Sequence, residues 1–492
     1  SQPIIVTDTT PTAVDDAAIV LTEGGTTGSG NVVTNDTASQ DGSPMINSFT
    51  YTNAAGAETT FTFSGATPST TVATPTGSLS VNADGSWTFT QAASIDHDDV
   101  DPTAGTFTYV LRDADSSLSN DATQVITVTD TNPVSSSASI SLSEADLPTG
   151  STTGSGNPTT TQSLAIVKGQ DDIADVVFAT SNVAGLPALT SNGVGLVYAL
   201  SNGGHTLTAT AGASGPSVFT LVINNPTDAT GATQTMTATL LAPLDQPGAT
   251  LSLLNVAYEV QDIDSSILSS AVVAIIDDTP LAPVDDAGIT VEEGGTSAGS
   301  ATSGANLLAN DVLGADGTTP RGLVYDITYT DRSGASQTAV VTVAGTTIET
   351  QYGTLTVEQD GDWSYVPVDS ADHVQPGNDL ELSDDFSYRT IDGDGDISGA
   401  SATQSITVTD TVPAIDTPDD ATVDEAALAN GSNPDAAALT VTGSLDLAPE
   451  QDSFDTTITS LPTGLTANGV ALEYVTQPDG HGVIAYQGPG RT

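Results

Sequence analysis

The sequence predicts an all-β protein built from tandem β-sandwich domains. Short runs with apolar residues at every second position recur along the chain, which is the pattern of half-buried strands. Turn residues separate these runs at intervals of roughly 8–12 residues, as in sandwiches. No segment of the 492 residues carries a sustained helical period of apolar side chains. Motifs also return at a fixed spacing, which indicates repeated domains.

The composition limits the classes of function. A length of 492 residues fits three or four domains of about 150 residues each. The chain has 62 Asp and Glu against 6 Lys and Arg, a formal net charge of −56. Such a chain cannot follow a nucleic-acid backbone, which requires a basic face. It also repels itself unless cations neutralise it. High charge can mean disorder, but the regular β pattern favours a folded chain.

The lack of cysteine limits how the domains can be stabilised, and the lack of a signal segment limits how the chain can be exported. The sequence contains none, so no disulfide staples the domains, and stability must come from β packing and metal ions. The abundance of Thr, Ser, Ala, Gly, Val and Asp suits an extracellular protein. No apolar stretch approaches the ~20 residues that span a membrane, and no secretory signal opens the chain. We expect an internal fragment or export through a distal C-terminal signal.

Two domain types alternate. Residues 1–11 are interpreted as the end of a preceding module, and residues 12–131 as a first domain, type A. Its clearest element is a hairpin in which Asp84-Gly85 joins an alternating strand to Trp87-Thr88-Phe89. Residues 280–411 repeat type A, since Val284-Asp285-Asp286 matches Val14-Asp15-Asp16 at an offset of 270 residues. The Trp363 hairpin and the Phe386-Ser387-Tyr388 strand have counterparts in the first copy as well.

Residues 132–279 form a different domain, type B. Residues 412–492 begin a second copy, because Asn468-Gly469-Val470 matches Asn192-Gly193-Val194. The order is therefore A-B-A-B. The sequence stops at Thr492, before any counterpart of Tyr258 to Ile276, so we expect the last domain to lack its final strands.

Carboxylates at alternate positions predict calcium. In the stretch Ile391 to Ile397, Asp392, Asp394 and Asp396 alternate with glycines and can direct several oxygens at one hard cation. Shorter copies occur after the penultimate strands of the first two domains. Hard oxygen ligands without cysteine disfavour zinc and copper. The alternative is that these are acidic turns in water.

Sandwich topology predicts where these acids gather. The first strand starts at the end facing the previous domain, and the loop before the last strand returns to that end. Acids from that loop should therefore meet acids of the preceding linker, approaching the 6–8 oxygens that calcium takes. The predicted ligands are Glu23, Asp130, Asn132, Asp262 and Asp264 at the first boundary; Glu144, Asp277, Asp278, Asp392, Asp394 and Asp396 at the second; Glu292 and Asp410 at the third; and Asp8, Asp113 and Asp115 at the start of the chain.

Other polar residues are interpreted as structural. A further ion is an alternative in the loops with Asp96, Asp98, Asp99 and Asp101, or with Asp372, Asp379, Asp384 and Asp385, but solvated loops are favoured. The four histidines form no zinc-protease motif. A glycosidase-like carboxylate pair is not excluded by inspection. Because every repeat carries the same acids, architecture is favoured over an active site, and we predict no enzyme.

The type A motifs resemble a known family. Val-Asp-Asp, Glu-Gly-Gly, Asp-Gly-x-Trp, Phe-x-Tyr, Asp-x-Asp and Thr-Val-Thr-Asp-Thr look like the VCBS-type, cadherin-like repeats of giant bacterial surface proteins. Type B resembles a repeat of adhesins exported by type I secretion. The resemblance implies Ig-like and cadherin-like sandwiches arranged as an elongated rod, the extender region of a repeats-in-toxin (RTX) adhesin with calcium between its domains. The family's Gly-Gly-x-Gly-x-Asp repeats do not occur here.

We therefore expect a calcium-stabilised stalk that projects a distal binding region for cell attachment and biofilm formation. Its partners would be its own neighbouring modules, joined through calcium, in a monomer that binds no nucleic acid and inserts in no membrane. A glycan- or partner-binding module is the first alternative, although aromatic residues make up only 4% of the chain. A polysaccharide-processing enzyme is the second.

Overall fold

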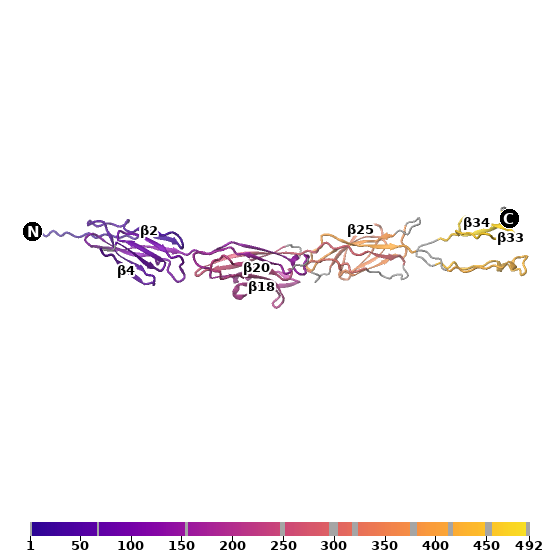
Figure 1. Ribbon diagram of the computed structural model, residues 1–492, viewed down its shortest axis with the longest axis horizontal. Coiled ribbons are helices and arrows are strands. Elements are labelled where there is room, and N and C mark those ends of the chain that lie inside the picture. Colours follow the sequence, from indigo (N-terminus) through magenta and orange to yellow (C-terminus); the bar gives the residue numbers. More distant parts are fainter. Residues whose placement is uncertain are drawn as a thin grey trace. The chain divides into compact units, whose positions relative to one another are not determined.

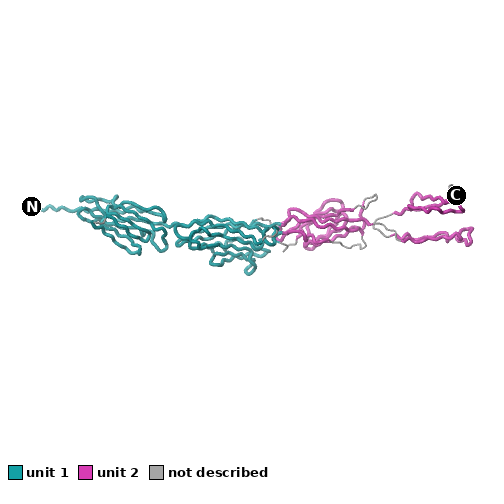
Figure 2. The backbone as a smooth tube through the Cα atoms, in the orientation of Figure 1, with its two compact units in different colours: residues 1–279, 314–320 teal, residues 280–313, 321–492 magenta. Residues whose placement is uncertain are grey.

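The expected all-β fold is confirmed by the computed structural model (Figure 1). It describes residues 2–65, 68–152, 156–246, 251–294, 304–316, 323–373, 381–411, 417–447 and 455–488. Asp379 and the predicted boundary at residue 412 lie outside these ranges. The chain forms two compact units (Figure 2): residues 1–279 with 314–320, and residues 280–313 with 321–492. Each unit is described separately, and the predicted domain boundaries remain predictions.

The first part of unit 1 contains two four-stranded sheets and a closing pair of strands. The sheets have the orders β2-β7-β6-β5 and β4-β3-β8-β9, and β1 pairs with β10. β1 and β10 run parallel, with Ile19 opposite Ile126 and Thr22 opposite Thr129. The strands are β1 Ile19–Thr22, β2 Gly28–Asn31, β3 Met45–Thr52, β4 Glu58–Thr62, β5 Ser69–Thr74, β6 Gly77–Asn82, β7 Ser86–Gln91, β8 Phe107–Arg112, β9 Leu118–Gln124 and β10 Ile126–Thr129.

Apolar side chains from both sheets meet in one core. Trp87 from one sheet packs edge-on against Phe107 from the other, with 6.0 Å between ring centroids. Both rings are buried, so this tryptophan is part of the core. The predicted hairpin is also present: β6 and β7 pair with Val81 opposite Trp87. Its turn requires glycine at Gly85, where φ is +90° and a Cβ would lie 2.3 Å from Val33.

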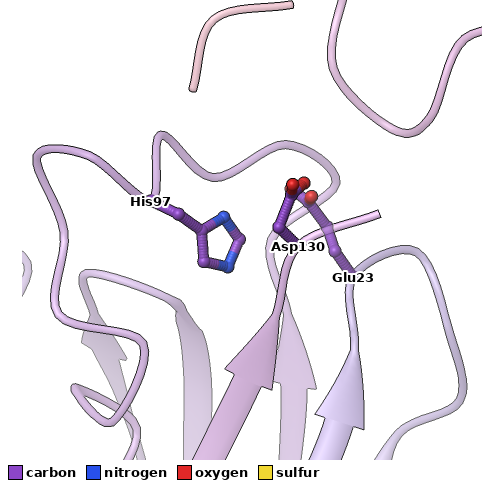
Figure 3. A group of neighbouring side chains, drawn as sticks. All are labelled: Glu23, His97 and Asp130. Carbon is purple, nitrogen blue, oxygen red and sulfur yellow. The ribbon is translucent and has the colours of Figure 1, made fainter. Parts of the chain in front are cut away.

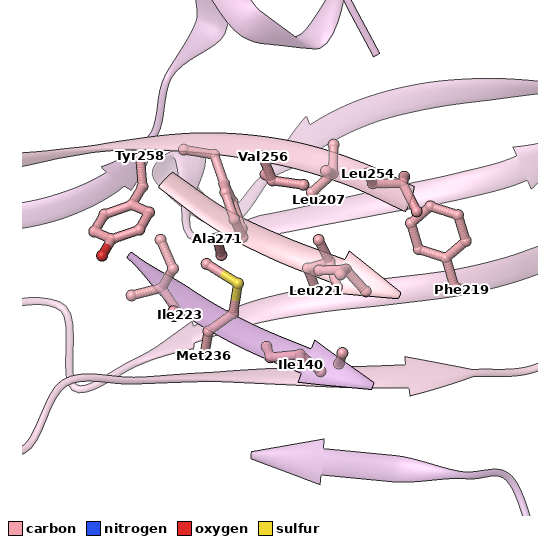
Figure 4. Packing of buried hydrophobic residues seen from close by; sticks show 14 of the residues in the cluster. Ile140, Leu207, Phe219, Leu221, Ile223, Met236, Leu254, Val256, Tyr258 and Ala271 are labelled. Carbon is pink, nitrogen blue, oxygen red and sulfur yellow. The ribbon is translucent and has the colours of Figure 1, made fainter. Parts of the chain in front are cut away.

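The second part of unit 1 is a larger sandwich. A four-stranded sheet, β12-β22-β21-β15, faces a six-stranded sheet, β13-β20-β19-β18-β17-β16, and β11 pairs with β14. Figure 4 shows Met236, Ile223 and Leu254 among the side chains that fill its core. The elements are β11 Val134–Ser135, β12 Ala138–Ser143, η1 Glu144–Asp146, β13 Thr159–Ser163, β14 Ile166–Val167, β15 Asp175–Phe178, α1 Thr180–Val183, β16 Thr190–Ser191, β17 Val194–Ser201, η2 Asn202–Gly204, β18 Thr206–Ala211, β19 Ser217–Asn224, β20 Thr235–Leu240, β21 Leu251–Gln261 and β22 Ser266–Ile276.

Unit 2 begins with a third sandwich that repeats the first. Its sheets have the orders β23-β32-β29, β25-β24-β30-β31 and β26-β27-β28. Trp363 packs edge-on against Phe386 at 5.6 Å, as Trp87 does against Phe107. The strands are β23 Ile289–Glu292, β24 Val324–Thr330, β25 Ser336–Val340, β26 Thr346–Glu349, β27 Gly353–Val357, β28 Trp363–Pro367, β29 Leu382–Ser383, β30 Phe386–Thr390, β31 Ala402–Gln404 and β32 Ile406–Thr409.

The described end of unit 2 carries a single small sheet of order β33-β34-β35. Its Asn468-Gly469 turn has positive φ at both residues, as the Asn192-Gly193 turn does in unit 1. The two turns therefore share one backbone conformation, and the second type B copy stays a prediction. Within the described residues, no helix is long and apolar enough to cross a membrane. The elements here are η3 Glu425–Ala427, η4 Ala436–Leu439, β33 Thr466–Ala467, β34 Val470–Thr476 and β35 Val483–Gln487.

Candidate metal centres

Parallel pairing of β1 with β10 brings two acids together at the end of the first sandwich. Both strands finish at the same edge, and the backbone N–H of Glu23 donates to the Thr129 carbonyl at 3.0 Å. Glu23 directly follows β1, and Asp130 directly follows β10. Figure 3 shows their carboxylates converging, with His97 on a neighbouring loop. Ligand atoms of these three residues lie within 4.8 Å of one another.

The second sandwich of unit 1 brings two more acids to this place. Asp262 and Asp264 lie in the tight loop between β21 and β22, which Ser265 closes by donating its N–H to Asp262 Oδ1 at 2.6 Å. Oxygens of Asp130, Asp262 and Asp264 lie within 4.8 Å of one another. The backbone N–H of His97 donates to Asp264 Oδ2 at 2.7 Å. The structure thus assembles four of the five predicted ligands, whereas Asn132 is exposed.

Several carboxylate oxygens of this cluster are buried without a hydrogen-bond partner. Glu23 is 2% exposed, and neither of its carboxylate oxygens accepts a hydrogen bond within the described residues. The same holds for Asp130 Oδ1, Asp264 Oδ1 and Asp171 Oδ2. A buried charge without a partner is costly, so these oxygens require protons or a cation. Asp171 was not predicted, because it lies outside any Asp-x-Asp run and only tertiary packing brings it to the cluster.

The pKa values of Glu23 and Asp130 are raised, which also shows that their ionised forms are unfavourable in the folded protein. Burial, with a contribution from Asp171, raises the pKa of Glu23 to about 7. Burial also raises the pKa of Asp130, and the nearby Asp264 and Asp262 add to the effect. A divalent cation would relieve all of these interactions at once, since it favours the ionised form of every carboxylate around it.

His97 acts as a donor in this cluster. Its Nδ1 lies 2.9 Å from the Ile95 carbonyl oxygen, and its Nε2 lies 3.2 Å from that of Val128. Both nitrogens face acceptors, so neither presents a free lone pair to a metal. Burial lowers the pKa of His97, but the Val128 and Ile95 carbonyls and the Glu23 carboxylate outweigh it, and the net shift is upward. The remaining donors are oxygens, which suits calcium better than a transition metal.

A second cluster in unit 1 contains Glu144, Asp277 and Asp316, with ligand atoms within 4.8 Å of one another. Glu144 is fully buried, and its Oε1 accepts from the Leu244 N–H at 2.8 Å. Asp316 was not predicted. Asp278 was predicted as a ligand, but its Oδ2 accepts from the backbone N–H groups of Ser151 and Ala315, at 2.8 and 2.9 Å. Asp278 therefore holds loops together.

The Asp392 loop belongs to unit 2. An isolated bridge between Ile391 and Ile397 closes it. Asp392 is fully buried, and its Oδ1 accepts from the backbone N–H of Asp396 at 2.7 Å. Burial and the adjacent Asp394 raise the pKa of Asp392 to about 7. Its Oδ2 has no hydrogen-bond partner within the described residues. The predicted convergence of this loop with Glu144 would join the two units and stays a prediction.

Glu293 replaces Glu292 in the third predicted set. Glu293, His373 and Asp410 lie together, whereas Glu292 is exposed. The prediction missed by one residue, which on a strand turns the side chain to the opposite face. The N–H of Glu293 donates to Thr409, as that of Glu23 donates to Thr129, with both bonds 3.0 Å long. Glu23 and Glu293 are thus true counterparts.

The acids at the start of the chain form an exposed group. Asp8, Asp41 and Asp115 lie within 4.8 Å of one another, although Asp41 was not predicted. Asp113 is 6% exposed, and its Oδ1 accepts from the Ser117 N–H at 2.8 Å, while its Oδ2 has no hydrogen-bond partner within the described residues. Of the four predicted sets, this one is the most open to solvent.

The other acidic loops support the structural interpretation. Asp96 accepts from the N–H of Asp98 at 3.1 Å, and Asp101 accepts from that of Thr103 at 2.8 Å, as turn caps do. Asp384 is 2% exposed, and its Oδ2 accepts from the Thr350 hydroxyl at 2.6 Å. Asp379 lies outside the described residues.

Comparisons with known proteins give little beyond this geometry. No family model matches the chain, and no curated protein matches it. Among solved structures, it is similar to the titin I-band fragment I67-I69 at 10% identity, covering 81% of this chain and 98% of that one, with a TM-score of 0.24. Human CDH23 EC21-23 is similar at 12% identity, covering 80% of this chain and 97% of that one, with a TM-score of 0.21. The protocadherin GammaB4 extracellular domain is similar at 12% identity, covering 85% of this chain and 52% of that one, with a TM-score of 0.24. Scores this low carry no argument, so the conclusions below rest on this chain's own residues.

Proposed function

We propose that this chain is a calcium-stabilised extender segment of a secreted bacterial surface adhesin. In this proposal it holds a distal binding region away from the cell for attachment and biofilm formation. It performs no catalysis, and its partners are its own neighbouring domains, joined through Ca²⁺. The proposal places the chain outside the cell, where millimolar calcium can saturate carboxylate sites of modest affinity.

The observation that carries the proposal is the state of Glu23. Neither of its buried oxygens has a hydrogen-bond partner at ordinary geometry within the described residues, and they lie where the loops of two sandwiches meet. Glu23 and Asp130 come from one sandwich, and Asp262 and Asp264 from the next. An ion bound by both would couple their relative orientation. In calcium-free solution the same acids would repel one another, so they would weaken the contact between the two sandwiches that a bound ion would strengthen.

Scattering and calorimetry test the proposal together. We expect calcium titration of the whole chain to release heat with at least one saturable site, and small-angle scattering to show a longer maximum dimension in calcium than in chelator. Glu23→Gln with Asp130→Asn should remove a site, whereas the exposed Glu58→Gln should not. Unchanged scattering and no saturable heat would refute the proposal. Specific binding of the isolated chain to a glycan array would favour the alternative, a ligand-binding module.

A further inference from the structure

Three acids that the sequence did not predict lie on loops that touch a preceding linker. The linkers are residues 8–11, 130–133 and 277–280. Asp41, Asp171 and Asp316 each interact with acids from elsewhere in the chain. In every case a residue one or two positions before the acid contacts the linker. An arrangement shared by three loops of different sequence indicates a shared task.

The loop 169–171 of the second sandwich fits closely against its linker. A Cβ built on Gly169 would lie 1.6 Å from the carbonyl oxygen of Thr131 and 3.3 Å from the carbonyl carbon of Asn132. The φ of Gly169 lies outside the left-handed region, so it is the close approach that requires glycine. Thr131 is held in turn, because its hydroxyl donates to the Glu23 carbonyl oxygen at 3.1 Å.

Two further contacts join the same loop to the first sandwich. Gln170 covers Gly24, where a Cβ would lie 2.2 Å from the Gln170 Cδ. The Ser94 hydroxyl donates to Asp171 Oδ1, and Asp171 is buried. Every residue of the loop therefore contacts the first sandwich or the linker, and none of these contacts requires an ion.

The other two loops make the same kind of contact with different residues. The loop 314–316 belongs to unit 1. A Cβ on Gly314, where φ is +90°, would lie 2.8 Å from the Asp278 carbonyl oxygen, and Ala315 is part of the core of the second sandwich. At the start of the chain, the backbone N–H of Gln40 donates to the Thr9 hydroxyl at 3.0 Å.

The loop contacts decide where the acids of a cluster lie relative to one another. Carboxylates bind an ion well only when the protein holds them around one point, and they repel one another when no ion is bound. At the first boundary Glu23 lies on the first sandwich and Asp264 on the second, so the gap between the two sandwiches sets the geometry of the site. The loop 169–171 limits this gap by direct contact with the linker backbone.

We propose that the loops 39–41, 169–171 and 314–316 are docking loops, which fit the linker backbone and hold the neighbouring acids in place for an ion. Gly169 and Gly314 are positioning residues, because a larger side chain would keep the loop away from the linker. The proposal deepens the calcium-stabilised stalk and rests on it for the identity of the ion. The docking contacts themselves use no ion.

Gly169→Ala tests the loop at the first boundary. We expect the apparent Kd of one class of calcium sites to rise about tenfold in calorimetric titrations of the full chain, because the docked fraction that can bind falls. Gly195→Ala, in β17 of the same sandwich, is the control, since a Cβ there would have no neighbour within 4 Å among the described residues. Both variants keep every carboxylate, and urea midpoints establish that both are folded.

A distance measurement separates docking from calcium binding. The chain has no cysteine, so spin labels on Ala55→Cys and Ser139→Cys, one exposed position in each sandwich, report the gap in calcium and in chelator. We expect Gly169→Ala to shift or broaden the distances more than Gly195→Ala does in both solutions. Identical distances, or an unchanged apparent Kd, would overturn the docking loop. Altered distances in a chain that binds no calcium would leave docking standing and remove the calcium-stabilised stalk.

A double-mutant cycle tests the loop without disturbing Gly169. Gly24→Ala places a methyl group against Gln170, and Gln170→Ala removes the obstructing atoms. We expect Gly24→Ala alone to raise the apparent Kd about threefold, and to have no such effect in the Gln170→Ala background. Gly56→Ala controls for backbone strain, since φ is +77° there and +68° at Gly24, and no described residue lies within 4 Å of its added Cβ. Equal effects of Gly24→Ala in both backgrounds would contradict docking through Gln170.

Discussion

Glu23→Gln should stabilise the protein in chelator and destabilise it in calcium. Gln keeps the shape of the side chain and removes its charge. In chelator at pH 8, wild-type Glu23 is ionised, buried and without a hydrogen-bond partner at ordinary geometry among the described residues, and burial raises its pKa from 4.5 to about 7. A raised pKa in an acid means that the folded state prefers the proton. The penalty is therefore complete above about pH 7 and absent below the unfolded pKa.

The size of both effects follows from linkage. In chelator at pH 8, removing the charge should stabilise the protein by up to about 3.5 kcal/mol, since the pKa rises from 4.5 to about 7 and each pH unit corresponds to roughly 1.4 kcal/mol. In calcium, the loss of a site whose ligand stands about a thousandfold above its Kd removes about 4.1 kcal/mol of unfolding free energy, which exceeds the gain from removing the charge and makes the net effect destabilising. Urea unfolding at pH 8, with 1 mM calcium or with chelator, measures both values.

A conservative surface change provides the control. Glu58 is exposed in β4, so Glu58→Gln should leave the unfolding free energy within about 0.5 kcal/mol in either condition. Destabilisation by Glu23→Gln in chelator as well as in calcium would refute our reasoning, because it would mean that the ionised side chain finds favourable contacts without an ion.

Three further predictions follow from the same contacts. Asp392→Asn should lower the melting temperature in calcium but not in chelator at pH 8, because the pKa of Asp392 is raised to about 7; scanning calorimetry measures both. In chelator, wild type should lose stability as the pH rises from about 4 to 7, and Asp16→Asn should flatten this slope below about pH 6 in urea titrations, since burial raises the pKa of Asp16 from 3.8 to about 6. Leu79→Ala, at a fully buried site, should cost about 2–4 kcal/mol in urea unfolding with or without calcium.

Local sequence patterns predicted the strands and hairpins well, because these elements depend mainly on residues close together in the sequence. The Asp84-Gly85 turn and the alternation around Trp87 specify a hairpin whatever surrounds it. The A-B-A-B order came from comparing the chain with itself. Placing Asp262 beside Asp130 needed only the topology of a sandwich, since it depends on which end of a sheet a loop reaches.

The prediction missed some acids of the clusters because their positions depend on contacts between residues far apart in the sequence. Asp171 and Asp316 come from loops without Asp-x-Asp spacing, and only tertiary packing brings them to the clusters. Glu292 and Glu293 are adjacent, so composition could not choose between them, whereas strand register could. The 270-residue offset already contained that register, and applying it to Glu23 gives Glu293.

Recurrence of an acid in the repeats does not make it a ligand. Tyr109 Oη lies 3.0 Å from both Asp16 Oδ2 and the Val32 carbonyl oxygen, and Tyr388 repeats this arrangement with Asp286 and Leu307. These acids recur because each accepts a hydrogen bond from a buried tyrosine hydroxyl. Glu23 differs from these acids, because it is buried and neither of its oxygens has a hydrogen-bond partner at ordinary geometry within the described residues. The distinction between the two classes of acid lies in how the carboxylate oxygens are satisfied, which a sequence motif cannot show.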